Sequence, residues 1–220
     1  MTQIDINDFS KFELKMTPTT KNRVGRLYLS IPYTYSEIYE ELERENWQSM
    51  SEIHQLGIDL WLGKRLKCRI PAYNNYKLQH IQRYFKSEKV KREFIKFLYE
   101  ITPNLLVNWD FTQDDMFNHT HFHGELTKDL PGFECNLHTD YRRLVGTGLI
   151  HWSEYDDPDL RTVFYNDCDR SNPIEMTTNF GDGWIHANGN DTWHDGWNRT
   201  KKNRYSTLLA LTANVRPINQ

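Results

Sequence analysis

The chain has 220 residues, of which 38% are hydrophobic and 14% are Phe, Trp or Tyr. This apolar content is enough to bury a core, which excludes an intrinsically disordered chain. The high content of aromatic residues favours a β-rich interior. Lys and Arg number 27 against 30 acidic residues, so the chain lacks the overall basic charge expected of a nucleic-acid-binding protein.

The first half of the chain is predicted to be rich in helices. After a strand at Arg26–Ile31, the segment Tyr35–Arg44 is predicted as a helix with Ser36 as its N-cap. Two further segments, 76–85 and 87–101, carry apolar residues at helical spacing, the second at Val90, Phe94, Phe97 and Leu98. We therefore expect residues 1–104 to form a helical support.

Residues 105–220 have a different sequence pattern. Short β-rich segments follow one another, separated by clusters of Gly, Asn and Asp, which is typical of an antiparallel sandwich or barrel. The predicted strands are Leu105–Phe111, Gly146–Trp152, Thr162–Tyr165, Gly183–His186 and Tyr205–Asn214. No linker divides the two halves, so a single domain of mixed α and β structure with a mainly β core is expected.

Three cysteines, Cys68, Cys135 and Cys168, form no Cys-x-x-Cys pair and are expected to be reduced thiols.

The N-terminal segment lacks the apolar stretch of a secretory signal, and no run of about 18 apolar residues could span a membrane. A cytoplasmic protein without a membrane span is the resulting expectation. The oligomeric state stays open.

The second half contains a candidate metal motif, His138-Thr139-Asp140. Residues i and i+2 of a strand point to the same face, so this motif presents an imidazole beside a carboxylate. A third ligand has to come from another strand, and a distal histidine is the usual donor. Two histidines and one carboxylate on one face of a metal leave three positions open, an arrangement that suits iron(II).

The candidate distal ligand is His194, which precedes a turn-rich stretch and then a hydrophobic strand. That strand begins with Arg204-Tyr205-Ser206, in which Arg204 and Ser206 share a face by the same i, i+2 rule. A guanidinium with a hydroxyl beside it suits the distal carboxylate of a dicarboxylic acid. The pattern therefore predicts a metal site next to an anion pocket.

The ordered set of His138-x-Asp140, His194 and Arg204-x-Ser206 resembles the Fe(II)/2-oxoglutarate-dependent dioxygenase superfamily, particularly its prolyl-4-hydroxylase-like branch. The resemblance covers roughly residues 133–216. It implies a double-stranded β-helix (jelly roll) core in residues 105–220, supported by the N-terminal helices. It also implies an enzyme that uses Fe(2+), the co-substrate 2-oxoglutarate and O2 to hydroxylate a C–H bond, releasing succinate and CO2.

Site residues follow from the same resemblance. His138, Asp140 and His194 are expected to bind the metal, Arg204 to pair with the 5-carboxylate of 2-oxoglutarate, and Ser206 to assist. Where the prolyl-hydroxylase-like branch has Thr-x-Ile-x-Tyr facing the co-substrate, this chain has Thr147-x-Leu149-x-His151. His151 is either a 2-oxoglutarate contact or a buried histidine bonded to a backbone carbonyl.

Two other interpretations remain. His119, His121 and Glu125 resemble the first metal motif of the cupins, although the Pro-x-Gly-x-x-His segment expected to complete it is missing before His194. The cupin interpretation also leaves Arg204 unexplained. If they bind no metal, His119, His121 and His123 are expected to line the entrance of the substrate pocket or to be exposed to solvent. The third interpretation is a non-catalytic, ligand-binding β-sandwich.

Several residues near these motifs are expected to be structural. His186 is expected to be a core histidine rather than a partner of a metal ligand, and Asp195 to begin a turn rather than orient an imidazole. The basic stretch Lys64–Arg69 is expected to be a solvated face, with a phosphate-contacting strip as the alternative. Arg142 and Arg143 are expected to be exposed, or else to contact an anionic substrate.

The substrate itself is not specified by any motif. Peptidyl proline, a free amino acid, a nucleobase and a small metabolite are all compatible with the sequence. The resemblance favours hydroxylation of a peptidyl or free amino acid, so a peptide or a small molecule is the expected partner.

Overall fold

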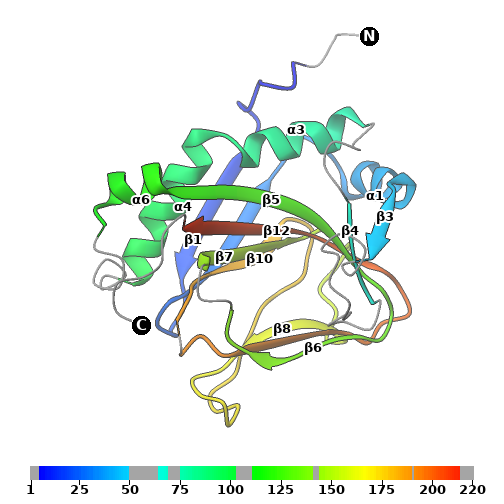
Figure 1. The fold of residues 1–220 in the computed structure, drawn as a ribbon. Helices are drawn as coiled ribbons and strands as arrows, with labels where there is room; N and C mark the ends of the chain where they lie inside the picture. The colour runs from blue at the N-terminus through cyan, green and yellow to red at the C-terminus, as the bar shows by residue number, and fades with distance from the viewer. Residues whose placement is uncertain are drawn as a thin grey trace.

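The computed structural model of the chain describes residues 5–49, 64–68, 75–102, 111–140, 144–189 and 191–213. Within these ranges the chain forms two antiparallel sheets and four helices (Figure 1). The predicted strand at 105–111 lies outside them except for its last residue. Arg142 and Arg143 also lie outside the described residues.

The two sheets face each other as a sandwich. The larger sheet has the order β1 (Glu13–Pro18), β2 (Val24–Ser30), β10 (Asp182–Ala187), β7 (Leu144–His151), β12 (Arg204–Ala213), β5 (Thr120–Asp129), β4 (Arg65–Cys68) and β3 (Trp47–Ser49). The smaller sheet has the order β6 (Phe133–His138), β11 (His194–Asn198), β8 (Leu160–Phe164) and β9 (Ile174–Glu175).

The path of the chain between the sheets defines the fold. From β5 to β12 the chain passes repeatedly from one sheet to the other, so that β5, β12, β7 and β10 lie side by side opposite β6, β11, β8 and β9. This is a double-stranded β-helix, and the predicted fold class is confirmed. The strands expected at 146–152, 162–165, 183–186 and 205–214 are present as β7, β8, β10 and β12, with ends shifted by one or two residues.

The N-terminal half contributes strands as well as helices. β1 and β2 extend the larger sheet beyond β10, and β3 and β4 extend its other edge beyond β5. Only β2 was expected from the sequence, because β3 and β4 are too short to show a period of two. The placement of β4 matters most, since it brings a basic segment to the space between the sheets.

Four helices, α1 (Tyr35–Arg44), α3 (Tyr76–Phe85), α4 (Glu88–Ile101) and α6 (Gln113–His119), are described. Figure 1 shows α3 and α4 on the face of the larger sheet that points away from the smaller sheet. The predicted face of α4 is confirmed, since its four residues are at most 4% exposed. The predicted N-cap of α1 was wrong: Thr34, two residues before Ser36, accepts the hydrogen bond from the Glu37 backbone N–H.

Alternation along β7 separates the two faces of the larger sheet. Gly146 and Gly148 face the helices, whereas Thr147 and Leu149 face the smaller sheet. A Cβ atom at Gly146 would lie 2.5 Å from a methyl group of Leu98, so glycine is what allows α4 to pack this closely. The same alternation on β12 turns Arg204 toward the smaller sheet.

A large apolar core fills the space between the helices and the larger sheet. A smaller cluster of Val24, Leu149, Phe164, Met176 and Trp184 lies between the two sheets. Beside this cluster the sheets enclose a cavity of about 330 Å³, lined by residues of both. None of the helices in the described ranges is long and apolar enough to cross a membrane.

Candidate active site

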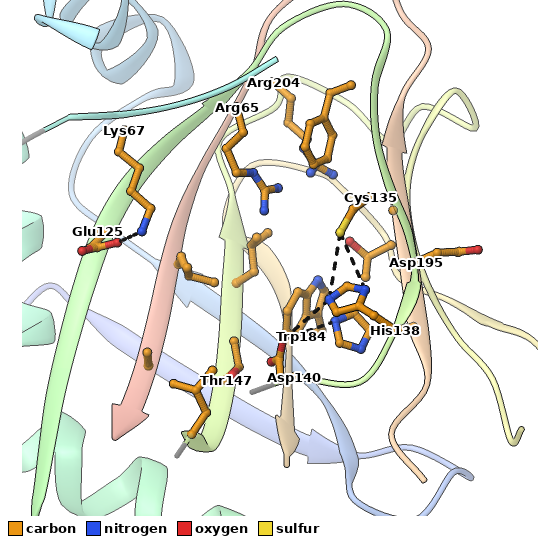
Figure 2. Close-up of a pocket in the computed structure, with 18 of the residues that line it drawn as sticks. Arg65, Lys67, Glu125, Cys135, His138, Asp140, Thr147, Trp184, Asp195 and Arg204 are labelled. Atoms are coloured by element: carbon orange, nitrogen blue, oxygen red, sulfur yellow. Dashed lines mark hydrogen bonds and ion pairs between the residues drawn. The ribbon is translucent and has the colours of Figure 1, made fainter. Parts of the chain in front are cut away.

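Three side chains of the predicted metal site meet at one wall of the cavity. One ligand atom from each of His138, Asp140 and His194 lies within 4.8 Å of the others, and no other such group of three occurs among the described residues. Asp140 Oδ1 lies 3.7 Å from His138 Nε2 and 3.9 Å from His194 Nε2. We call these three residues the candidate triad (Figure 2).

Strand pairing brings the candidate triad together. β6 and β11 are antiparallel neighbours, and His138 and His194 are direct partners in their register. β6 ends at His138, so Asp140 does not lie in the strand, as the i, i+2 argument assumed, but two residues beyond it. The carboxylate nevertheless faces both imidazoles.

Backbone carbonyls fix the orientation of both histidines. His138 Nδ1 lies 2.7 Å from the Asn136 carbonyl oxygen, and His194 Nδ1 lies 3.0 Å from that of Thr192. Because each Nδ1 donates its proton to a carbonyl, Nε2 is the ring nitrogen that faces Asp140 and that is available to a metal once it carries no proton. Metal-binding histidines in proteins are held in this way.

Asp140 is oriented by His186, which sequence analysis assigned to the core. His186 is fully buried on β10, and its Nε2 donates to Asp140 Oδ2 at 3.0 Å. This bond leaves Oδ1 facing the two Nε2 atoms of the candidate triad. The expectation of a purely structural His186 was therefore wrong, because the contact with Asp140 depends on strand pairing that the sequence does not show.

The protonation states of the candidate triad follow from burial and hydrogen bonding. Hydrogen bonds with His138 and His186 outweigh burial and hold the pKa of Asp140 well below its usual range, so this carboxylate is ionised. Burial lowers the pKa of His194 to about 3 and keeps it neutral. Burial would also lower the pKa of His138, but hydrogen bonds with Asp140 and Cys135 raise it to about 10. A metal that binds here therefore displaces a proton from His138.

Arg204 lies in a second polar group of the cavity, together with Arg65 and Asp129, which we call the arginine cluster. Arg204 Nε donates to Asp129 Oδ2 at 2.7 Å. Arg65 binds the same carboxylate through Nε and Nη2, at 2.6 and 2.8 Å. Arg204 is 2% exposed and Asp129 is fully buried.

The sheet register explains this cluster. Asp129 on β5 is the direct partner of Arg204 on β12 and of Arg65 on β4, so the three residues form one row across neighbouring strands. The segment Lys64–Arg69 was expected from the sequence to be a solvated face. That expectation was wrong for Arg65 and Lys67, both of which line the cavity.

The arginine cluster consists of two cationic side chains and one carboxylate. The two guanidinium groups stay charged at neutral pH, and their proximity outweighs burial to keep the pKa of Asp129 below its usual value. Both guanidinium groups thus share the carboxylate of Asp129. Arg204 Nη1 is buried and has no hydrogen-bond partner within the described part of the chain. Together these features favour the binding of one further carboxylate.

Comparison with solved structures identifies the fold. A prolyl-4-hydroxylase from Pseudomonas putida is similar with a TM-score of 0.51 and 11% identity, covering 96% of this chain and 97% of that one. A Trichoplax adhaerens prolyl hydroxylase, solved with a hypoxia-inducible-factor peptide, has a TM-score of 0.55 and 11% identity over 94% and 87% of the two chains. HygX from Streptomyces hygroscopicus, solved with nickel and 2-oxoglutarate, has a TM-score of 0.50 and 10% identity, covering 88% of this chain and 84% of that one.

The chain has the fold of the 2-oxoglutarate–iron(II) oxygenases. No family model and no curated protein matches the sequence. The resemblance inferred from five residues is thus confirmed at the level of the fold, over most of the chain rather than over residues 133–216 alone.

Two further residues expected at the co-substrate site are fully buried and are not among the residues that line the cavity. Ser206 and His151 are direct partners on β12 and β7, and both are fully buried. Ser206 Oγ is 2.7 Å from Thr127 Oγ1. Neither ring nitrogen of His151 has a hydrogen-bond partner among the residues described, so the alternative of a bond to a backbone carbonyl was wrong. Their contact with 2-oxoglutarate stays a prediction.

The histidines of the cupin interpretation do not form a metal site. His119 ends helix α6, where it is exposed and stacks on Phe111. His121 is exposed on β5, while Glu125 forms an ion pair with Lys67. Among the described residues, no group of three ligand atoms close enough to share a metal includes any of them.

Asp195 also differs from expectation. It lies within β11, before the turn, and is buried. It accepts hydrogen bonds from Tyr165 Oη at 3.0 Å and Arg170 Nε at 3.2 Å. These bonds tie β11 to the loop after β8 and so help to fix the strand that carries His194.

Proposed function

We propose that the protein is an Fe(II)- and 2-oxoglutarate-dependent dioxygenase that hydroxylates a C–H bond of an amino acid or peptide. The proposal rests on one observation above all. The carboxylate oxygen and the two imidazole nitrogens of the candidate triad converge in the same cavity as the positively charged arginine cluster. The oxygenase fold supports the same interpretation.

The donor set of the candidate triad fits iron(II). Two neutral imidazoles and one carboxylate on one side of an ion leave positions open toward the cavity. Bound there, Fe(II) would supply the activation of O2 that couples oxidative decarboxylation of 2-oxoglutarate, to succinate and CO2, to hydroxylation of the substrate. His186 and the carbonyls of Asn136 and Thr192 would keep the ligands in place.

The arginine cluster fits the far carboxylate of 2-oxoglutarate. Arg204 would bind the 5-carboxylate, as expected from the sequence, with Arg65 as a second cation that the sequence did not suggest. An added carboxylate would supply a partner for the buried Arg204 Nη1, and a charged hydrogen bond is most stabilising where water is excluded. Arg65 also stacks on Phe133, with its guanidinium carbon 4.3 Å from the ring centre, which holds it toward the cavity.

The decisive test is iron-dependent turnover of 2-oxoglutarate. Protein purified anaerobically and given Fe(II), 2-oxoglutarate and air is expected to form succinate slowly even without a substrate. Asp140→Ala is expected to abolish succinate formation and to weaken Mn(II) binding measured by calorimetry. His121→Ala, which removes an exposed histidine outside the candidate triad, is the matched control and is expected to behave as wild type. Unchanged turnover in Asp140→Ala contradicts the triad.

The same assay separates the other two interpretations. A cupin-type enzyme would lose metal in His121→Ala and keep it in Asp140→Ala. A non-catalytic sandwich would bind 2-oxoglutarate or another ligand without forming succinate.

Arg204→Gln is expected to raise the 2-oxoglutarate KM by about tenfold to a hundredfold, since a buried carboxylate loses a charged hydrogen-bond donor.

A further inference from the structure

A third polar group lines the cavity and takes no part in the proposed binding of metal or 2-oxoglutarate. It consists of Lys67 on β4 with Glu125 and His123 on β5, and we call it the ion-pair corner. Lys67 Nζ forms an ion pair with Glu125 Oε2, and Lys67 is only 9% exposed. Figure 2 shows this pair across the cavity from His138 and Asp140.

The wall between the ion-pair corner and the candidate triad is mainly apolar. Glu125 is the direct partner of Leu208 on β12, which in turn is the partner of Leu149 on β7. The next row along the sheet runs from His123 through Ala210 to Thr147. An aliphatic chain could therefore lie along this wall with its end near the candidate triad.

Two polar atoms near this wall have unmet hydrogen-bonding capacity. Thr147 Oγ1 and His123 Nδ1 are buried and have no hydrogen-bond partner in the described part of the chain. Thr147 is 4% exposed and lines the cavity. Buried polar atoms are nearly always hydrogen-bonded in folded proteins, so atoms of this kind in a cavity wall point to a ligand that completes them.

Charge narrows the choice of ligand. The arginine cluster takes one carboxylate, as argued above, whereas Lys67 and Glu125 already cancel each other. A ligand with a net charge at the ion-pair corner would leave a buried charge unbalanced, which is costly. A ligand with one positive and one negative group close together would exchange one ion pair for two and leave every charge compensated.

We infer that the ion-pair corner binds the main-chain ammonium and carboxylate of a free α-amino acid with a neutral aliphatic side chain. Glu125 binds the ammonium, Lys67 binds the carboxylate, and the side chain crosses the apolar wall to the candidate triad. An internal residue of a peptide carries neither charge and does not fit this corner. The inference rests on the proposed function and selects one substrate class for it.

The reaction that follows is balanced. The amino acid, 2-oxoglutarate and O2 give a hydroxylated amino acid, succinate and CO2. One oxygen atom enters the C–H bond of the side chain, and the other enters the new carboxylate of succinate. The two electrons needed beyond those of the C–H bond come from the decarboxylation of 2-oxoglutarate.

The first test uses the wild-type protein with Fe(II) and 2-oxoglutarate. L-valine, L-leucine, L-isoleucine and L-proline are added singly, each beside its N-acetyl and carboxamide derivatives and a peptide that contains it internally. At least one free amino acid is expected to stimulate succinate formation and to gain one oxygen atom by mass spectrometry. Both derivatives are expected to lose this effect, because each lacks one charge. Stimulation by peptides alone, or by the derivatives as well, overturns the inference.

The second test exchanges the charges, in the double variant Lys67→Glu with Glu125→Lys. A pair with only a structural role survives this exchange, so stimulation by the amino acid would be retained. A recognition pair is reversed, and stimulation is expected to fall by about tenfold or more while the melting temperature stays near that of wild type. Lys64→Gln, an exposed lysine on the same segment, is the control and is expected to be neutral.

The outcomes of the two proposals are distinguishable. Succinate formation by wild type without an amino acid, combined with no response to any of the four amino acids, refutes the inference alone. No succinate under any condition refutes the proposed function. Calorimetry of the responsive amino acid with Zn(II)-loaded protein and 2-oxoglutarate gives a binding constant that is independent of turnover, and it should weaken in the charge-exchange variant.

Discussion

The carboxylate of Asp129 holds the arginine cluster together, and Asp129→Asn tests this role. Asp129 is fully buried, and Arg65 and Arg204 both bind it. The variant keeps the size of the side chain but removes its charge. It thus leaves two guanidinium groups, with 13% and 2% of their side chains exposed, close together without the carboxylate that both of them bind.

The expected loss of stability is large. Breaking a buried ion pair by removing one partner costs about 3–5 kcal/mol, because the remaining charge is buried alone. For a chain of this size that corresponds to a fall of roughly 6–20 °C in melting temperature. Urea and thermal unfolding of the metal-free protein, followed by circular dichroism, measure both quantities. Added 2-oxoglutarate is expected to raise the melting temperature of Asp129→Asn more than that of wild type, since its carboxylate replaces the missing charge.

A matched control removes a carboxylate that is also paired with an arginine, but at the surface. Glu134 lies 3.3 Å from Arg199, and both side chains are more than half exposed. Glu134→Gln is expected to cost less than about 1 kcal/mol. If Asp129→Asn is no less stable than this control, the buried charge balance argued for the arginine cluster is refuted.

Three further predictions concern other parts of the site and the sheet. His186→Gln is expected to weaken Mn(II) binding about 10- to 100-fold in calorimetry, because Asp140 loses the donor that orients it. Burial and the neighbouring Arg204 hold the pKa of His151 well below 6.5, so the unfolded chain gains a proton below that pH and the folded chain does not. Stability therefore falls as the pH drops from 7 to 5, and His151→Leu is expected to reduce this slope by up to about 1.4 kcal/mol per pH unit in urea unfolding. Gly183→Ala is expected to cost about 1–3 kcal/mol in the same assay, since its Cβ would lie 2.0 Å from the backbone oxygen of Leu149.

Each of these three has a clear contrary result. Metal affinity that is unchanged in His186→Gln would mean that the Asn136 and Thr192 carbonyls and the fold alone orient the candidate triad. An unfolding free energy whose pH dependence is the same in His151→Leu and in wild type would mean that His151 is protonated inside the fold. A Gly183→Ala variant as stable as wild type would mean that β10 and β7 can separate at this point without cost.

Local patterns were sufficient for the parts of the fold that depend on neighbours in sequence. Helices α3 and α4 were predicted within one residue of their ends, because the spacing of apolar residues fixes which side of a helix is buried. Strands β7, β10 and β12 were also found, since long β-rich runs between turn residues differ clearly from helices. The short edge strands β3 and β4 carry no such pattern and were missed.

In the candidate triad too, some features could be predicted from the sequence and others could not. The motif His138-x-Asp140 and the later His194 could be selected from the sequence by residue type and order. The oxygenase fold expected from them is present. His186 could not be assigned, because its partner Asp140 lies 46 positions away and the contact depends on β10 lying beside β7.

The sequence by itself determined the helices, the alternating strands and the residue types able to hold a metal and a dicarboxylate, because these depend on spacing within one segment. Only the tertiary structure decided that Arg65 and Asp129 join Arg204, and that Lys67 and Glu125 face the cavity. Each of these contacts joins β5 to β4 or to β12, between residues that lie 58 to 75 positions apart in the chain. The order and register of strands set such contacts, and no period within a single strand encodes its neighbours.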